Sequence, residues 1–175
     1  MGNPEVWLRG PLPDILPWLQ PVAHSLLQSR EEVESTLPGL SAEQRWTREA
    51  GAASVGYHVR HAANSLDRLF TYARGEMLSE TQLAVLGAEG QTPTPTQMMD
   101  VAALTEEFSR AIERALAQLR STNEEILLEP RAVGRGRLPS TVIGLLFHGA
   151  EHTQRHVGQM VTTAKFVRAS AVQSR

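Results

Sequence analysis

The chain has 175 residues, of which 41% are hydrophobic and 21% are charged, and its formal net charge at pH 7 is -2. This length and composition predict one soluble domain with a sizeable core, and the near-neutral charge provides no electrostatic basis for binding nucleic acid. The sequence contains no cysteine, which excludes disulfide scaffolds, thiolate metal sites and cysteine nucleophiles.

Residues 1–17 include Pro4, Pro11, Pro13 and Pro17, so we expect an N-terminal extension that wraps the surface instead of a long helix. The first residues have neither the basic nor the apolar segment of a signal peptide, and no apolar run approaches the roughly 20 residues that span a bilayer. A cytoplasmic protein without a membrane partner is therefore expected.

Two amphipathic helices are predicted in the first half of the chain. Apolar residues recur at steps of three and four near 18–37, and Pro38-Gly39 ends that helix. A polar connection at 40–53, with Trp46 as its large apolar anchor, leads to a second helix near 54–74. Ser54 can cap this helix and Gly75 can end it.

The second half of the chain predicts two more long helices. A short helix near 79–86 and a loop at 87–97 precede a third long helix near 98–120. The glycines at 134 and 136 permit a tight turn or short hairpin before the fourth helix, near 140–168, which Ser140 can cap. The whole predicts an all-α fold, a four-helix bundle in one domain covering 1–175, with a frayed tail at 169–175.

The fourth helix carries the sequence FHGAEHTQRHVGQM, from Phe147 to Met160. His152 and His156 are four residues apart, so both imidazoles leave the same face of a helix and can bind one metal ion. His148 and Gln159 extend this polar stripe, either as pocket or supporting residues or as ordinary packing and interhelical hydrogen-bonding groups.

A third ligand must come from another helix, and the second helix offers two histidines, His58 and His61. His61 lies one position before the predicted core residue Ala62 and can face the bundle interior. His58 competes with it, as a half-buried histidine or as a hydrogen-bonding partner of a ligand. We interpret His24, which has no partner in sequence, as structural.

The segments SVGYHVRHAANSLDRL and GAEHTQRHVGQ together resemble the DinB-like superfamily, which includes the YfiT-like metal-dependent hydrolases. The resemblance implies an up-down-down-up bundle, often dimeric, with a metal site formed by three histidines. It assigns these ligands to His61, His152 and His156. Arg155 stands where a further histidine is frequent, and Val157 where an arginine is common, which affects the surroundings of the site but removes no ligand.

Zinc suits three neutral imidazoles best, although Ni, Co, Fe(II) or Mn can occupy such a site. Three imidazoles leave coordination positions of the ion open, and the ion would lower the pKa of a water bound there toward about 7. Some relatives are thiol-dependent S-transferases that act with mycothiol or bacillithiol. The resemblance therefore implies either a transferase that uses a low-molecular-weight thiol or a hydrolase, acting on a small molecule. The alternative is a non-catalytic bundle that binds a metal or a small ligand, with a stress-related role.

The charged residues near these motifs leave the catalytic residues unassigned. Glu151 points about 100° away from His152 around the helix, and Asp67 lies six residues after His61, so neither shares the ligand face closely. The sequence also lacks the H-E-x-x-H motif. Three arginines in the predicted hairpin can either reach an anionic substrate or form a solvated basic loop: Arg131, Arg135 and Arg137.

Overall fold

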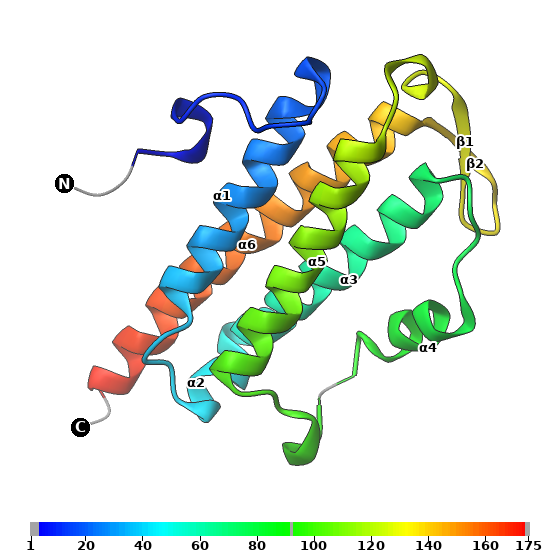
Figure 1. The fold of residues 1–175 in the computed structure, drawn as a ribbon. Coiled ribbons are helices and arrows are strands. Elements are labelled where there is room, and N and C mark those ends of the chain that lie inside the picture. The colour runs from blue at the N-terminus through cyan, green and yellow to red at the C-terminus, as the bar shows by residue number, and fades with distance from the viewer. Residues whose placement is uncertain (1–3, 92, 174–175) are drawn as a thin grey trace.

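The computed structural model describes residues 4–91 and 93–173. Its four long helices are α1 (Gln20–Thr36), α3 (Val55–Ala73), α5 (Val101–Ser121) and α6 (Val142–Gln173). In Figure 1, α1 and α6 run in one direction and α3 and α5 in the other. Both α5 and α6 pack against α1 and against α3. The predicted up-down-down-up four-helix bundle is therefore confirmed.

The core lies between these helices and consists of the apolar positions that the periodicity indicates. From α1 and α3, Leu26, Val59 and Leu66 have at most 1% of their surface exposed, and from α5 and α6 Phe108 and Met160 have none exposed. The strongly amphipathic α3 and α5 turn their polar sides outward, which fits helices on the surface of a bundle.

Two helices begin later than predicted because a side chain caps them. The third predicted helix begins at Val101 instead of near 98, since the Asp100 side chain accepts a hydrogen bond from the Ala103 backbone at 2.8 Å. The fourth begins at Val142, where the Thr141 hydroxyl accepts from the Gly144 backbone at 3.1 Å. The Ser140 cap that we predicted is therefore wrong, because Ser140 belongs to a strand.

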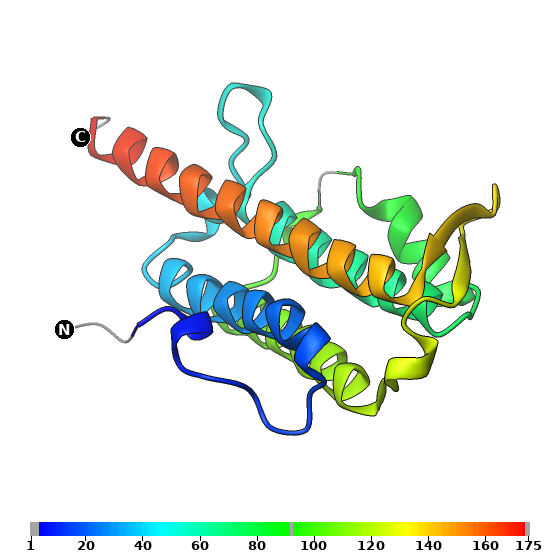
Figure 2. The same ribbon diagram turned by 90° about the horizontal axis from the view of Figure 1, so that it is seen from above.

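The N-terminal extension lies along α1, as Figure 2 shows from above. Within residues 4–17, Val6 is buried and its backbone N–H donates to the Gln28 side chain at 3.1 Å, while Arg9 pairs with Glu31 on α1. His24 is within hydrogen-bonding distance of the Gly10 carbonyl, Nε2 to O 3.0 Å, which supports its structural interpretation. From residue 4 onward the segment predicted to wrap the surface lies against α1, and residues 1–3 lie outside the described residues.

The predicted frayed tail is helical as far as Gln173, whereas residues 174 and 175 lie outside the described residues. Arg168 holds this end of α6 against the rest of the bundle by donating to the carbonyls of Thr36 and Pro38, at 2.7 and 3.0 Å. These bonds also satisfy carbonyl groups at the end of α1. They join two segments that are distant in sequence, so no local pattern predicts them.

Shorter elements cover the sides and one end of the bundle. They are helices α2 (Ala42–Trp46) and α4 (Glu80–Ala88), and the antiparallel strands β1 (Pro130–Val133) and β2 (Leu138–Thr141). The hairpin and the short helix near 79–86 were both expected. Arg131 ties the hairpin to the end of α3, since its Nε donates to the Ala73 carbonyl at 2.8 Å. Among the helices of the described residues, none is long and apolar enough to cross a membrane.

Candidate metal centre

The site forms where α3 and α6 pack side by side in opposite directions (Figure 1). Gly149 permits their close approach, because a Cβ atom at this position would lie 2.9 Å from the Phe70 ring on α3. His152 then lies almost one turn beyond Gly149, and His156 one turn further. The two helices thus bring the predicted pair on α6 opposite His61 on α3.

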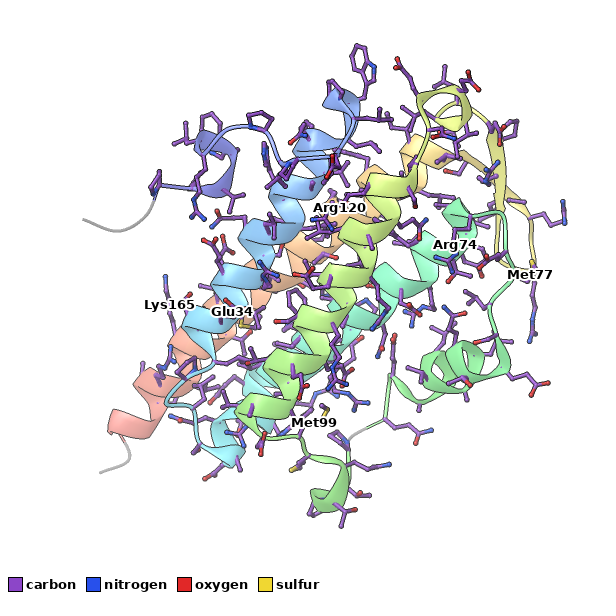
Figure 3. All side chains as sticks on the ribbon, in the orientation of Figure 1. Glu34, Arg74, Met77, Met99, Arg120 and Lys165 are labelled. Atoms are coloured by element: carbon purple, nitrogen blue, oxygen red, sulfur yellow. The ribbon has the colours of Figure 1, made fainter. Side chains whose placement is uncertain are left out.

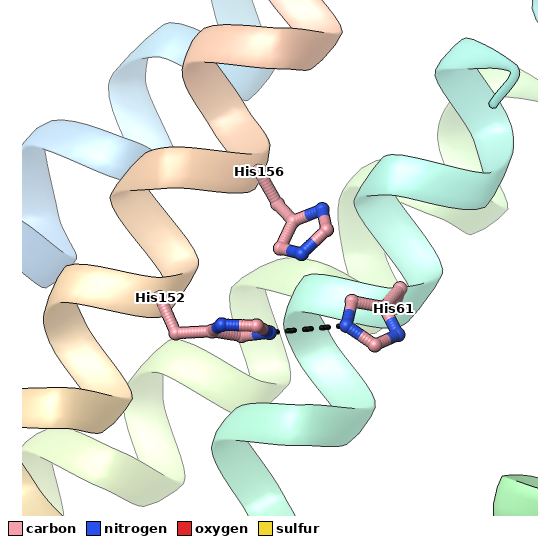
Figure 4. A group of neighbouring side chains, drawn as sticks. All are labelled: His61, His152 and His156. Carbon is pink, nitrogen blue, oxygen red and sulfur yellow. Dashed lines mark hydrogen bonds between the residues drawn. The ribbon is translucent and has the colours of Figure 1, made fainter. Parts of the chain in front are cut away.

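His61, His152 and His156 each offer a ring nitrogen, and these nitrogens all lie within 4.8 Å of one another. His61 Nε2 and His152 Nε2 are 3.0 Å apart, and Figure 4 shows the His156 ring beside the line that joins them. Two nitrogens that each lie about 2.0–2.1 Å from one tetrahedral ion are separated by roughly 3.3 Å. The spacing and chemistry of this donor set therefore fit a divalent metal ion.

Glu89, at the C-terminal cap of α4, holds the other nitrogen of His61. The distance from His61 Nδ1 to Glu89 Oε2 is 2.9 Å, and Arg68 donates to both oxygens of the same carboxylate at 2.6 and 3.2 Å. A carboxylate on Nδ1 keeps the proton there and leaves the Nε2 lone pair for a metal. Burial raises the pKa of Glu89, but the hydrogen bonds from His61 and Arg68 outweigh it and hold the pKa below its ordinary value.

The ring of His61 is also oriented from within its own helix. Tyr57, one turn earlier on α3, stacks on it with a centroid separation of 5.4 Å and an interplanar angle of 9°. Glu89 and Tyr57 together therefore fix the direction of Nε2 before any ion binds.

His58 supports the site from the other side of the cluster. Its Nδ1 lies 3.1 Å from Nδ1 of His156, so one of these two nitrogens donates to the other. When Nδ1 of His156 is the donor, its Nε2 carries the lone pair that an ion requires. This geometry places His58 as a partner of a predicted ligand, which is one of the roles expected for it.

The surroundings of His58, His152 and His156 favour their neutral form. Burial is the main cause that lowers the pKa of His58, His152 and His156, and the charges of neighbouring histidines lower it further. The effect is largest for His156, whose pKa falls to about 4. A metal ion binds imidazole only in its neutral form. The two ligands on α6, His152 and His156, therefore stay neutral at pH values where an isolated histidine is already protonated.

A family model described as the DinB superfamily matches residues 25–160, a span that contains all three histidines. The chain belongs to the DinB superfamily. No curated protein matches it. The family that the two histidine motifs resemble is thus confirmed, and the fold agrees with it.

The remaining residues that we considered in this DinB superfamily member lie further from the cluster. His148 is half exposed and its Nδ1 lies 3.2 Å from Glu151 at the surface, although its ring centroid is 5.6 Å from that of His152. Glu151 also pairs with Arg155. Gln159 is exposed, and among the hydrogen bonds of the described residues none joins it to the three histidines. Asp67 accepts from Gln82 instead, at 2.7 Å.

A cavity of about 420 Å³ adjoins the centre on the side of α4, and His61 and Glu89 form part of its wall. Described residues that line it also include Trp46, the last residue of α2, and Met99, which precedes α5. The arginines at 131, 135 and 137 are not among them. Sequence reasoning missed Glu89, because it comes from a helix whose packing against α3 is not encoded in any local pattern.

Proposed function

We propose that this DinB superfamily member is a metal-dependent enzyme. A divalent ion, zinc by preference, is held by His61, His152 and His156, and a small molecule reacts in the adjoining cavity. The observation that carries the proposal is the convergence of the three ring nitrogens within 4.8 Å. The carboxylate of Glu89 on the outer nitrogen of His61 supports it, because such a partner is typical of metal-binding histidines.

A divalent ion on three neutral imidazoles supplies Lewis acidity and lowers the pKa of a bound water or thiol. The protein's own residues orient and enclose this centre. Glu89 holds the proton of His61 on Nδ1, and Tyr57 fixes the ring plane. Glu89 is unsuited to act as a general base, because Arg68 and His61 already occupy its oxygens. The proposed reaction class is therefore transfer of a low-molecular-weight thiol to a small substrate, or hydrolysis of that substrate.

The metal content of protein purified without an affinity tag or added metal tests this proposal. We expect about one divalent ion per chain in the parent and in His24→Ala, which alters a histidine that contacts the Gly10 carbonyl. His156→Ala should contain much less. Equal metal in the parent and His156→Ala would refute the assignment of the ligands.

Activity is then measured with the metal-loaded protein, low-molecular-weight thiols and small electrophilic substrates. Turnover that requires both metal and thiol identifies a transferase, and turnover without thiol identifies a hydrolase. Full metal occupancy without turnover of either kind would favour the non-catalytic binding protein.

The protein is further proposed to form a homodimer, as members of the family often do. Support comes from large apolar side chains that remain exposed on α6 and near the start of α1, where Phe147, Phe166 and Trp18 have 60%, 63% and 64% of their surface accessible. Apolar surface of this kind is frequently covered by a partner. Sedimentation at micromolar concentration should give twice the mass of one chain, and a monomer would refute this proposal.

A further inference from the structure

The cavity beside His61 contains a positive charge that has no partner among the described residues. Its volume of about 420 Å³ lies in the lower part of the range for small-molecule pockets, about 300–1,000 Å³. Arg60, adjacent to His61 on α3, lines it and is half-buried. Within residues 4–91 and 93–173, the Arg60 guanidinium makes no hydrogen bond or ion pair, and its Nε is enclosed without a partner.

A second donor in the same wall is also unpaired. Nε1 of Trp46 is buried and has no acceptor among the described residues. Both groups can only donate hydrogen bonds. A buried donor without an acceptor costs about 1–3 kcal/mol, and more when it is charged. These two nitrogens are enclosed in the wall, so a ligand in the cavity would contact the outer nitrogens of Arg60 instead.

The acidic residue of the described lining does not neutralise Arg60. This residue is Glu89, whose oxygens are already taken by Arg68 and His61. Arg68 balances the charge of Glu89, so Arg60 gives the cavity a net positive charge. A divalent ion bound by neutral histidines would add to that charge. The electrostatics of the cavity therefore favour an anion.

The rest of the lining indicates which kind of anion fits. Trp46, Tyr57 and Met99 provide an apolar and largely aromatic wall, and Figure 3 shows Met99 at the beginning of α5. One guanidinium matches the planar geometry of one carboxylate through two parallel hydrogen bonds. An inorganic phosphate would require several donors and would gain nothing from the apolar wall. An organic acid with an apolar body satisfies both features.

We propose that Arg60 binds the carboxylate of a small organic acid whose apolar body lies against Trp46 and Tyr57. Since Nε is enclosed, the outer nitrogens Nη1 and Nη2 of Arg60 would contact the ligand. This inference rests on the proposed function, because it names the class of substrate that would bind in the cavity beside the proposed metal ligand His61.

The test compares phenylacetate with phenylacetamide, which has nearly the same size and shape but no charge. Binding is titrated by ligand-observed NMR, first with the metal-loaded parent protein. We expect the acid to bind about tenfold more tightly than the amide, as for a hydrogen-bonded charge. In Arg60→Met this preference should disappear while the metal content is retained. If the amide binds the parent as tightly as the acid does, the proposal is overturned.

Arg120→Met is the matched control, since Arg120 lies on the exposed side of α5, away from the cavity lining (Figure 3). It should preserve the preference for the acid. Thermal midpoints show whether each variant is folded, and Arg60→Gln replaces Arg60→Met if the methionine variant unfolds. A preference for the acid that survives the loss of the Arg60 charge would contradict the proposal.

The same titration on His156→Ala with chelator separates this inference from the proposed function. A carboxylate bound by Arg60 keeps its preference over the amide when the metal is absent. If the preference vanishes together with the metal, the ion binds the carboxylate and the role of Arg60 is wrong. If the parent contains no metal but still prefers the acid, the proposed function fails and the anion site remains.

Discussion

Replacing Glu89 by glutamine tests whether the histidine cluster is built to bind metal. The carboxylate accepts from His61 Nδ1 at 2.9 Å and from Arg68 at 2.6 and 3.2 Å. Glutamine has nearly the same shape, but it carries no charge and only one acceptor oxygen. If that oxygen remains with Arg68, His61 loses the partner that fixes its proton on Nδ1 and orients Nε2.

Loss of such a partner lowers metal affinity by about 10- to 100-fold, which corresponds to about 1.4–2.8 kcal/mol. Competition with a chromophoric chelator measures the Kd of Zn²⁺ for the parent and for Glu89→Gln. The free energy of unfolding of the metal-free protein should also fall, by about 1–3 kcal/mol, because the buried Arg68 loses part of its pairing.

Two controls separate these effects. Glu151→Gln removes a surface carboxylate that pairs with His148 and Arg155, and it should leave the Kd unchanged. Arg68→Met keeps the Glu89 carboxylate on His61, so it should lower stability while leaving metal affinity within a few-fold of the parent. A Glu89→Gln variant that binds Zn²⁺ as tightly as the parent would refute the argument that Glu89 prepares His61 for a metal.

Further predictions concern the histidines and the packing of α3. His58→Ala should retain most of the metal, because His58 contacts Nδ1 of the ligand His156, whereas His61→Ala should lose the metal. Equilibrium dialysis measures the metal content of both variants, and the reverse result would make His58 the ligand. In the metal-free protein the pKa of His156 is lowered to about 4, so the unfolded state binds more protons below about pH 6.5. The contribution of His156 to the free energy of unfolding should therefore be complete above pH 6.5 and be lost as the pH falls toward 4. Urea titrations at several pH values measure this, and the decrease should be less steep in His156→Ala. Equal decreases in the parent and the variant would contradict the prediction. Gly56→Ala should lower the free energy of unfolding by about 1–3 kcal/mol, because the added Cβ would lie 2.7 Å from the Trp46 ring. Gly158→Ala should raise it by about 0.5–1 kcal/mol, because the space around that position is open. Thermal unfolding of the two variants measures both effects.

The sequence predicts the parts of this protein that depend on local geometry. Helix periodicity places His152 and His156 on one face, and it also identifies the four long helices and their buried positions. The association of His61 with this pair came from the resemblance of the two motifs to a family, because no helix pattern says which helix packs against α6. Small errors at the helix starts arose from the caps provided by Asp100 and Thr141.

The surroundings of the site depend on tertiary contacts that leave no such pattern. Glu89 follows His61 by 28 residues and lies at the end of a short helix with no buried residues, so its contact with α3 is invisible in the sequence. The unpaired state of Arg60 is equally hidden. Its recognition requires knowing that Arg68 binds Glu89 and that no other described carboxylate lines the cavity.

The two sides of the centre differ in how firmly they are prepared. On α3, Tyr57 stacks on His61 and Glu89 holds its Nδ1. On α6, His156 is held through His58, but Nδ1 of His152 is buried without a hydrogen-bond partner among the described residues. The tautomer of His152 is thus fixed only by what its Nε2 contacts. Without an ion, Nε2 of His152 lies 3.0 Å from Nε2 of His61, whose lone pair keeps the proton of His152 on Nε2. A metal ion at Nε2 would place that proton on Nδ1, so metal binding changes the tautomer of this ligand. The rigid half of the centre is therefore the half that borders the cavity, where a substrate would meet it.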